Sequence, residues 1–223
     1  MADPPDLRFL DALEPSQADA LRALGGRRRY AAGALLFHER EAGETVLVLV
    51  SGRVKLGCVT DEGREAVLAI RGPGDLIGEM AAVDGAPRLA TATALEPVEA
   101  LALPADAFVA FLERTPGAAM AMVRTLNRRL RDADRKRVGF LAQDTVGRVC
   151  ARLVELAERF GEAAGDGVEV DLSFTQEELA GWTGSSRESV IKALRSLREL
   201  GWIATRRRGV TILDVGALRR RAL

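Results

Sequence analysis

The spacing of hydrophobic and polar positions changes along the chain. From about residue 32 to residue 104, short apolar runs alternate with glycine-containing turns, which is typical of a compact antiparallel β-barrel or sandwich. The runs that predict strands are ALLFHER, TVLVLVSG, RVKLGCVT, AVLAIRG, LATATAL and VEALALP. Apolar residues at helical spacing on either side predict helices over residues 15–24 and 105–114.

A longer helical pattern follows, from about residue 117 to residue 145. Its apolar residues recur at three- and four-residue steps, at Val123, Leu126, Leu130, Ala133 and Phe140. A seam this narrow favours pairing with a second helix over packing in a single core, although the single packed helix remains the alternative. Arg137 interrupts the seam near its end.

The pattern then predicts a second helix at VGRVCARLVELAERFG, a loop at AAGDG and a short strand at VEVDLSF. Thr175 with Glu178, and Ser185 with Glu188, have the spacing of capping boxes, so two helices are expected to begin near residues 176 and 186. Gly184 lies between them, where a sharp turn favours a residue that tolerates positive φ.

These two helices have the features of a helix-turn-helix. Ala180 is small where the helices must cross, and Val190 and Leu194 supply a buried face for the second helix. An ordinary helical hairpin would explain the glycine but not the polar start SSRES. The following WIATRRRGVTILD predicts a β-hairpin with a basic turn, which is either the wing of a DNA-binding domain or a solvated loop.

The outward side of the second helix suits recognition of DNA bases. Arg187 can pair with guanine, Glu188 can accept from the cytosine amino group, and Lys192 can reach guanine or a phosphate. Ser186, Ser189 and Arg195 are expected on the phosphate backbone, as are Arg207 and Arg208 if the basic turn is a wing. Thr175 is also expected to contact DNA. From Asp171 onward the sequence contains ten basic and six acidic residues, which gives this part a net charge of +4. The residues before Asp171 therefore carry a net charge of −4. A basic C-terminal third indicates a polyanionic partner.

Composition narrows the class of protein. The 223 residues fit two modest domains, and 48% hydrophobic with 29% charged residues is typical of a folded globular chain. No signal peptide or membrane span is evident, which predicts a cytoplasmic protein without a membrane partner. Two distant cysteines and one histidine, His38, predict neither a metal site nor a disulfide. No nucleophile–base pair is apparent, so an enzyme is not expected.

A separate motif is GEMAAVDGAPRLATA, in which Glu79 and Arg88 stand nine residues apart. The two side chains could clamp a ligand or pair with each other in an empty pocket. The motif is similar to the phosphate-binding cassette of cyclic-nucleotide domains, and TGSSRESVIKAL resembles the recognition helix of the cAMP receptor protein/FNR family of bacterial transcription regulators. The glycines that match those of the family's β-roll are Gly33, Gly43, Gly52 and Gly74.

The resemblance implies an α+β fold in three parts. Residues 1–116 would form a cyclic-nucleotide-binding, jelly-roll-like β-roll, residues 117–145 a dimerisation helix, and residues 146–223 a winged helix-turn-helix. In a homodimer, the two recognition helices would read a palindromic operator in double-stranded DNA, with RNA polymerase as a further partner.

The resemblance also assigns ligand contacts. Glu79 would accept the ribose hydroxyl, Arg88 would bind the cyclic phosphate, and the backbone amides of Gly78, Glu79, Met80 and Ala81 would add an anion-binding nest. The next position often carries Ser or Thr in the family, but here it is Leu89. The purine-facing positions are Ala133, which cannot hydrogen-bond, and Asp134, which can accept from an amino group.

Three hypotheses follow. The chain is a DNA-binding transcription regulator controlled by a cyclic nucleotide, with cAMP expected and cGMP as the other candidate. Alternatively, it is such a regulator with a sensor pocket that binds no ligand or another effector. The third hypothesis is a cyclic-nucleotide module that acts on a protein partner; the basic wing and the polar recognition face speak against it.

Overall fold

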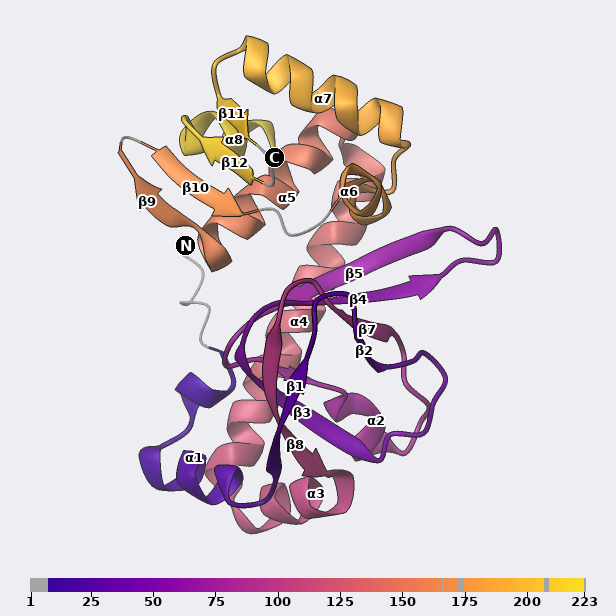
Figure 1. The fold of residues 1–223 in the computed structure, drawn as a ribbon, viewed down its shortest axis with the longest axis vertical. Helices are drawn as coiled ribbons and strands as arrows, with labels where there is room; N and C mark the ends of the chain where they lie inside the picture. The colour runs from indigo at the N-terminus through magenta and orange to yellow at the C-terminus, as the bar shows by residue number, and fades with distance from the viewer. Residues whose placement is uncertain (1–7, 166, 172–174, 207–208, 223) are drawn as a thin grey trace. The chain divides into compact units, whose positions relative to one another are not determined.

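The computed structural model describes residues 8–165, 167–171, 175–206 and 209–222. The chain divides into two compact units (Figure 1). The N-terminal unit comprises Met1–Cys58 and Leu68–Arg131, and the C-terminal unit comprises Val59–Val67 and Asp132–Leu223.

Two four-stranded sheets form the β-rich part of the N-terminal unit, with strand orders β1-β8-β3-β6 and β2-β7-β4-β5. Pairing of β8 with β1 and β3, of β3 with β6, and of β7 with β2 and β4 is antiparallel. The strands are β1 Gly26–Tyr30, β2 Leu35–Phe37, β3 Thr45–Ser51, β4 Val54–Val59, β5 Glu65–Arg71, β6 Leu76–Ile77, β7 Thr91–Ala94 and β8 Val98–Pro104. The expected antiparallel β-rich domain is therefore confirmed.

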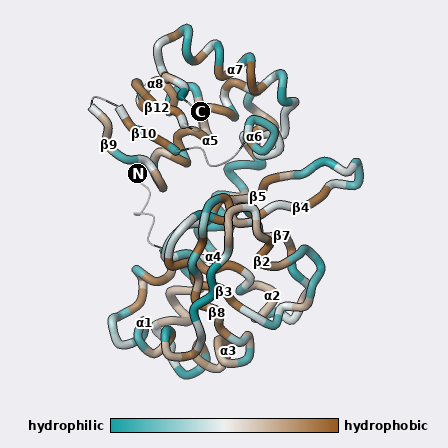
Figure 2. The backbone as a smooth tube through the Cα atoms, in the orientation of Figure 1, coloured by the Kyte–Doolittle hydropathy of each residue, from teal (hydrophilic) through white to brown (hydrophobic). Residues whose placement is uncertain are grey.

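Strand β3 is buried on both faces, which explains its unbroken apolar sequence. Leu47 and Leu49 pack into a core with residues of β4, β6, β7 and β8. Val46 and Val48 belong to a second core, in which helices cover the other face of the sheet. Figure 2 shows the hydrophobic residues of this strand and of β8 beside it. The helical elements are η1 Leu10–Ala12, α1 Pro15–Arg22, α2 Glu79–Asp84, α3 Ala105–Arg114 and α4 Pro116–Ala142.

Strand β1 was not predicted, because its sequence GRRRY carries no apolar alternation. It lies at the edge of its sheet, where only β8 pairs with it. Arg27 and Arg29 project from the same face of the strand and form ion pairs with Glu99 of β8, at 2.5 and 3.6 Å. This strand therefore contacts its neighbour through cross-strand ion pairs, rather than through the buried apolar side chains from which a strand is usually predicted.

Among its described residues, the C-terminal unit combines the end of α4 and several further helices with a sheet of order β11-β12-β10-β9. Its elements are α5 Thr145–Phe160, β9 Glu162–Ala164, β10 Gly167–Asp171, α6 Gln176–Thr183, α7 Arg187–Glu199, β11 Ile203–Arg206, β12 Gly209–Ile212 and α8 Val215–Arg221. The antiparallel pairing of β11 with β12 confirms the predicted hairpin. Arg207 and Arg208, and Leu172 to Phe174 of the expected strand, lie outside the described residues.

Two boundaries differ from the prediction. The long helix ends at Ala142 rather than near residue 145, because the Asp144 carboxylate accepts a hydrogen bond from the Gly147 N–H (2.8 Å) and begins α5. This backbone bond also lowers the pKa of Asp144, and Arg221 and Arg148 add to the shift.

The prediction of a loop at AAGDG is wrong in part, since Ala163 and Ala164 belong to β9 and Gly167 begins β10, the strand that pairs with it. Pairing with a neighbouring strand overrides the weak strand preference of alanine.

The helix-turn-helix geometry agrees with the sequence except at one cap. Thr175 and Glu178 form the predicted capping box at α6, and Gly184 adopts φ +56° after it. The predicted box of Ser185 with Glu188 is wrong. The cap of α7 is Ser186, whose hydroxyl accepts from the Ser189 N–H at 3.2 Å. The side chain of Ser185 instead contacts Arg148, which removes it from the cap position.

Ser186→Ala is therefore expected to lower the free energy of unfolding of the C-terminal unit by about 1 kcal/mol, because an N-terminal amide of α7 loses its acceptor. Urea denaturation monitored by circular dichroism measures the effect. Ser186→Asp is the matched control and should retain most of the stability, since a carboxylate caps as well as a hydroxyl. Equal losses in both variants would contradict the assigned cap.

Candidate ligand and DNA interfaces

The cassette residues surround the short helix α2 in the N-terminal unit. Gly78 precedes α2 with φ +79°, and a Cβ there would clash with Nη1 of Arg88. Glycine is therefore required both by the left-handed backbone and by the close approach of the guanidinium. Glu79 and Ala81 are buried, whereas Met80 is exposed.

Arg88 is buried, and among the described residues it donates hydrogen bonds only to backbone oxygens. Its Nη1 donates to Gly78 O (2.6 Å) and its Nη2 to Thr45 O (2.5 Å), and its Cζ lies 4.4 Å from the centroid of the Phe37 ring. The buried Nε has no acceptor among the described residues. Burial lowers the pKa of Arg88, while the negative charges of Glu79 and Glu41 oppose the shift. A buried guanidinium with an unused N–H is suited to receiving an anion.

Glu79 forms its ion pair with Arg129 of α4, not with Arg88. Oε1 of Glu79 lies 2.5 Å from Nη1 of Arg129, and Nη2 of Arg129 donates to Leu76 O at 2.7 Å. The alternative in which Glu79 and Arg88 pair directly is therefore wrong. The second carboxylate oxygen of Glu79 can still accept a hydroxyl.

Arg129 was missed by the sequence reasoning, although a signal for it exists. Ala118, Met122 and Thr125 mark the buried side of α4 at three- and four-residue steps, and Arg129 stands four residues after Thr125. A basic residue that continues a buried stripe implies an acidic partner in the core.

The other expected ligand positions differ in exposure. The Leu89 side chain is 66% exposed and follows Arg88 directly, so no hydroxyl is offered at this position. Ala133 and Asp134 are exposed on α4, and Asp134 forms an ion pair with Arg137 at 3.4 Å. Both belong to the C-terminal unit, whereas Arg88 belongs to the N-terminal one.

In the C-terminal unit, Arg148 of α5 fixes the turn between the two helices of the helix-turn-helix. Its Nε donates to Thr183 O (2.7 Å), its Nη1 to Gln143 O (2.6 Å) and its Nη2 to Ser185 Oγ (3.1 Å). Because one guanidinium donates all three hydrogen bonds, it holds the start of α7 in place relative to α5. No sequence pattern indicates this role, because the partners are mainly backbone oxygens.

Helix α7 presents a polar face to solvent and an apolar face to the core. Val190, Ala193, Leu194 and Leu197 are buried, as expected for Val190 and Leu194. Arg187, Glu188, Lys192 and Arg195 are exposed, and Ser189 is half-buried behind the cap. Figure 2 shows the corresponding alternation of polar and apolar residues along α7.

The charged groups on the exposed face of α7 influence one another. A bond from its own backbone N–H lowers the pKa of Glu188, and Ser186, Arg187 and Lys192 add to the shift, so this carboxylate is an acceptor at neutral pH. Arg195 pairs with Glu199 at 2.9 Å, and Thr175 stands at the start of α6.

Comparison with known proteins identifies both units. Residues 27–115 match the model of the cyclic nucleotide-binding domain, and residues 147–221 match the model of the Crp-like helix-turn-helix domain. The two matched domains define a DNA-binding transcription regulator with a cyclic-nucleotide-binding domain, and proteins of this class are regulators rather than enzymes.

Relatives cover nearly the whole chain. A CRP-like cAMP-activated global transcriptional regulator of Mycobacterium tuberculosis is 36% identical over 214 residues, 96% of each chain. The cyclic AMP receptor protein of Thermus thermophilus is 33% identical and covers 85% of this chain and 84% of its own. The chain belongs to the Crp/Fnr family of transcription regulators.

Solved structures agree with this assignment. A CRP-family transcriptional regulator from Thermus thermophilus superimposes with a TM-score of 0.74 at 30% identity, over 87% of this chain and 96% of that one. FixK2 from Bradyrhizobium japonicum gives 0.80 over 89% and 98%, and at 19% identity it supports the fold alone. Within the described residues, no helix has the length and apolarity needed to cross a bilayer.

Proposed function

We propose that this protein is a homodimeric regulator that binds cAMP at the Glu79–Arg88 cassette and then reads a palindromic operator with α7. The observation that carries the proposal is the buried Arg88, which is held by two carbonyl oxygens and keeps its Nε for an anion. The same chain carries a recognition helix with a polar outer face. The functional division is residues 1–116 for the sensor, 117–145 for dimerisation and 146–223 for DNA.

Each part of the nucleotide has a chemically suitable group in the chain. The cyclic phosphate binds Arg88 and the backbone amides of Gly78 to Ala81, and the ribose hydroxyl donates to Glu79. Ala133 and Asp134 remain the expected purine-facing positions, since a carboxylate can accept from the adenine amino group. Support for cAMP over cGMP comes from the names of the M. tuberculosis and T. thermophilus relatives, which state a response to cAMP or its binding.

Isothermal titration calorimetry tests the nucleotide. Saturable heat with cAMP, at least ten times tighter than with cGMP, is the expected result. A pocket that is empty or tuned to another effector would give no heat with either nucleotide, and the exposed Leu89 is the residue that favours this second candidate.

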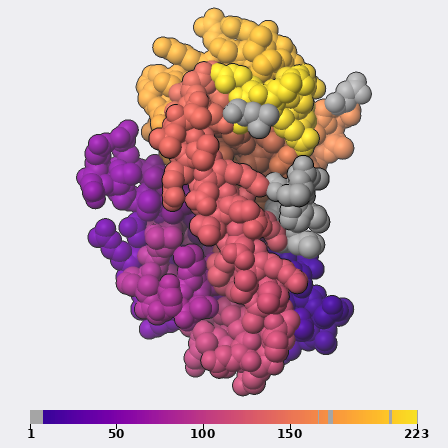
Figure 3. Space-filling model, turned by 180° about the vertical axis from the view of Figure 1, so that it is seen from behind, coloured from indigo at the N-terminus to yellow at the C-terminus, as the bar shows by residue number. Residues whose placement is uncertain are grey.

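The dimer interface is proposed along α4. Met120, Val123 and Leu130 are between 48% and 60% exposed, far more than apolar residues that pack within a chain. Leu126, by contrast, packs against the unit's own core, so it leaves the predicted seam. Figure 3 shows residues of α4, in pink, at the surface on this side. A second copy of the same helix buries this stripe in the manner of a coiled coil.

Val123→Glu with Leu130→Glu is expected to convert the dimer into a monomer, because two carboxylates per helix would face their symmetry mates. Sedimentation velocity measures the change. The paired control, Arg124→Glu with Arg131→Glu, alters charge on exposed positions beside the stripe. Dimers in both double variants would contradict α4 as the interface.

The roles on DNA are assigned by chemistry and exposure. Arg187, Glu188 and Lys192 read base edges, while Thr175, Ser186, Ser189 and Arg195 contact phosphates. The roles of Arg207 and Arg208 in the wing remain expectations. A regulator of this kind acts where the bacterial chromosome lies, in the cytoplasm, and RNA polymerase is its proposed protein partner.

Arg187→Ala is expected to weaken binding to the cognate operator by about 1–3 kcal/mol and to relax the base preference at the contacted position. Fluorescence anisotropy with cognate and scrambled duplexes measures both effects. Arg219→Ala, on an exposed arginine of α8 that pairs with Glu158, is the control and should bind like wild type. Equal weakening of Arg187→Ala on the two duplexes would mean that Arg187 touches only the backbone.

A further inference from the structure

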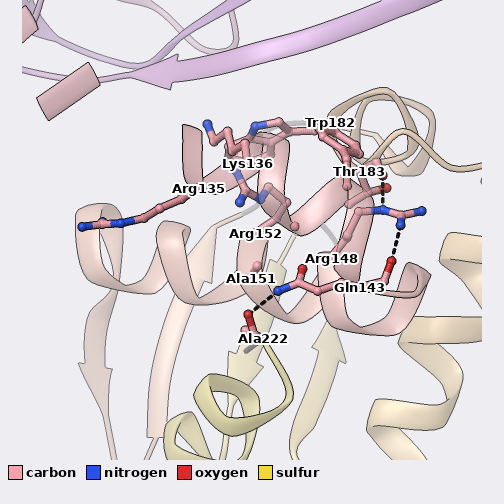
Figure 4. Close-up of a pocket in the computed structure, with 11 residues that line it drawn as sticks. Arg135, Lys136, Gln143, Arg148, Ala151, Arg152, Trp182, Thr183 and Ala222 are labelled. Carbon is pink, nitrogen blue, oxygen red and sulfur yellow. Dashed lines mark hydrogen bonds between the residues drawn. The ribbon is translucent and has the colours of Figure 1, made fainter. Parts of the chain in front are cut away.

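A cavity of about 180 Å³ opens in the C-terminal unit, between the end of α4, helix α5 and the end of α6 (Figure 4). Its lining includes four basic residues, and no acidic residue stands among the described lining residues. Two aromatic residues, Phe140 and Trp182, complete the wall. Neither cyclic-nucleotide binding nor base reading uses this cavity.

The basic groups are held in place before any ligand arrives. Arg148 is fixed by its three hydrogen bonds to the turn of the helix-turn-helix. Lys136 and Arg152 share the carboxylate of Glu155, at 3.3 and 2.6 Å. Burial opposes ionisation of Glu155, but Lys136, Arg152 and Arg159 outweigh it and lower its pKa. Glu155, which is not itself a lining residue, thus holds two of the lining cations in place, and the turn of the helix-turn-helix holds a third.

Trp182 gives the cavity an apolar surface of defined shape. It is 3% exposed, and Lys136 Nζ and Arg152 Cζ each lie 5.6 Å from its ring centroid. In Figure 4 these two basic side chains converge near the indole, whereas Arg135 extends away. A ligand that meets the cations also meets an aromatic surface, so it combines a negative charge with a flat apolar group.

The volume limits the ligand to a single ring. The cavity of about 180 Å³ slightly exceeds the ~150 Å³ of an engineered cavity that binds benzene. It is smaller than the ~300 Å³ at which sites for larger organic ligands begin. A cyclic nucleotide is therefore too large, and a benzoate-sized ion fits.

We propose that this cavity binds a small aromatic carboxylate. The carboxylate lies against Lys136 and the guanidinium groups of Arg148 and Arg152, and the ring packs beside Trp182 and Phe140. Such a ligand contacts the last turns of α4 and the first helix of the helix-turn-helix at once. None of the residues that line the cavity is a proposed contact of the cyclic nucleotide.

Fluorine NMR of the full-length protein labelled with 5-fluorotryptophan tests the proposal, since the chain holds only Trp182 and Trp202. Trp202→Phe assigns the two resonances. Benzoate is expected to shift the Trp182 resonance saturably. Benzamide, which has the same ring without the charge, and inorganic phosphate, which has a charge without the ring, should each bind at least about tenfold more weakly.

Variants assign the site. Lys136→Gln should weaken benzoate binding about tenfold or more, because a buried charge-assisted contact is lost. Arg137→Gln, one residue along and 77% exposed, is the matched control and should bind like wild type. Ala151→Leu fills the cavity without removing a charge and should abolish the shift, which decides the question if Lys136→Gln unfolds.

Any one of the following results would overturn the proposal. They are the absence of a saturable Trp182 shift with benzoate, equal affinity for benzamide, and unchanged binding in Ala151→Leu. Phosphate that binds as tightly as benzoate would also overturn it, because the site would then recognise an oxyanion without its ring. The Trp182 shift with benzoate is measured without cAMP, and Arg88→Ala should not change it. A failure of cAMP binding can therefore be told apart from a failure of benzoate binding.

Discussion

Arg88→Ala is expected to raise the dissociation constant for cAMP by about 100-fold or more. Each hydrogen bond to a charged group contributes about 1.5–3 kcal/mol, and a guanidinium can offer two to the cyclic phosphate. Loss of both corresponds to a factor of about 10² to 10⁴. Calorimetry with cAMP measures the change directly.

Two further variants separate ligand binding from folding. Arg88→Lys keeps the charge but not the forked geometry, so it should lie between wild type and Arg88→Ala. Arg114→Ala, which removes an exposed arginine of α3, should bind cAMP normally. Wild-type affinity in Arg88→Ala, with an unchanged melting curve, would remove Arg88 from the ligand site.

Arg129→Met is expected to lower the free energy of unfolding of the N-terminal unit by about 3–5 kcal/mol. Glu79 is 3% exposed and Arg129 is 17% exposed, so the substitution leaves a buried carboxylate without its ion-pair partner. Urea denaturation of the full-length protein, with circular dichroism as the signal, measures the loss.

A double variant tests whether the loss arises from the isolated charge. Glu79→Gln combined with Arg129→Met removes both charges, and it should recover at least half of the stability lost in Arg129→Met alone. If Arg129→Met lowers the stability by less than about 0.5 kcal/mol, which is the size of most surface substitutions, the two residues are not a buried pair in solution.

The sequence predicted the fold where hydrophobic period and turn chemistry agree. Strand β3 and the capping box of α6 are examples, because a continuous apolar run and the Thr175–Glu178 spacing mark them within a few residues of sequence. Strand β1 was missed because its arginines are stabilised by Glu99 on another strand. The cap of α7 was placed one residue early because Ser185 and Ser186 are equivalent in pattern, and only the contact with Arg148 distinguishes them.

The candidate ligand site was predictable in part for the same reason. Glu79 and Arg88 lie within one motif, and the structure places both at α2, with Glu79 buried in its first turn and Arg88 beside Gly78. Arg129 is 50 residues away in sequence, and its pairing with Glu79 depends on how α4 packs across the sheet. Long-range partners of buried charges need the tertiary structure, whereas local motifs do not.

The proposed function requires that cAMP binding controls sequence-specific DNA binding. A band-shift with the wild-type protein on a palindrome of the TGTGA/TCACA type, with and without cAMP, tests it most directly. We expect a discrete complex of two protomers per duplex that forms at least about tenfold more tightly with cAMP than without it, and no such gain in Arg88→Ala. Equal binding in the presence and absence of cAMP would contradict nucleotide control, and equal binding to a scrambled duplex would contradict sequence recognition.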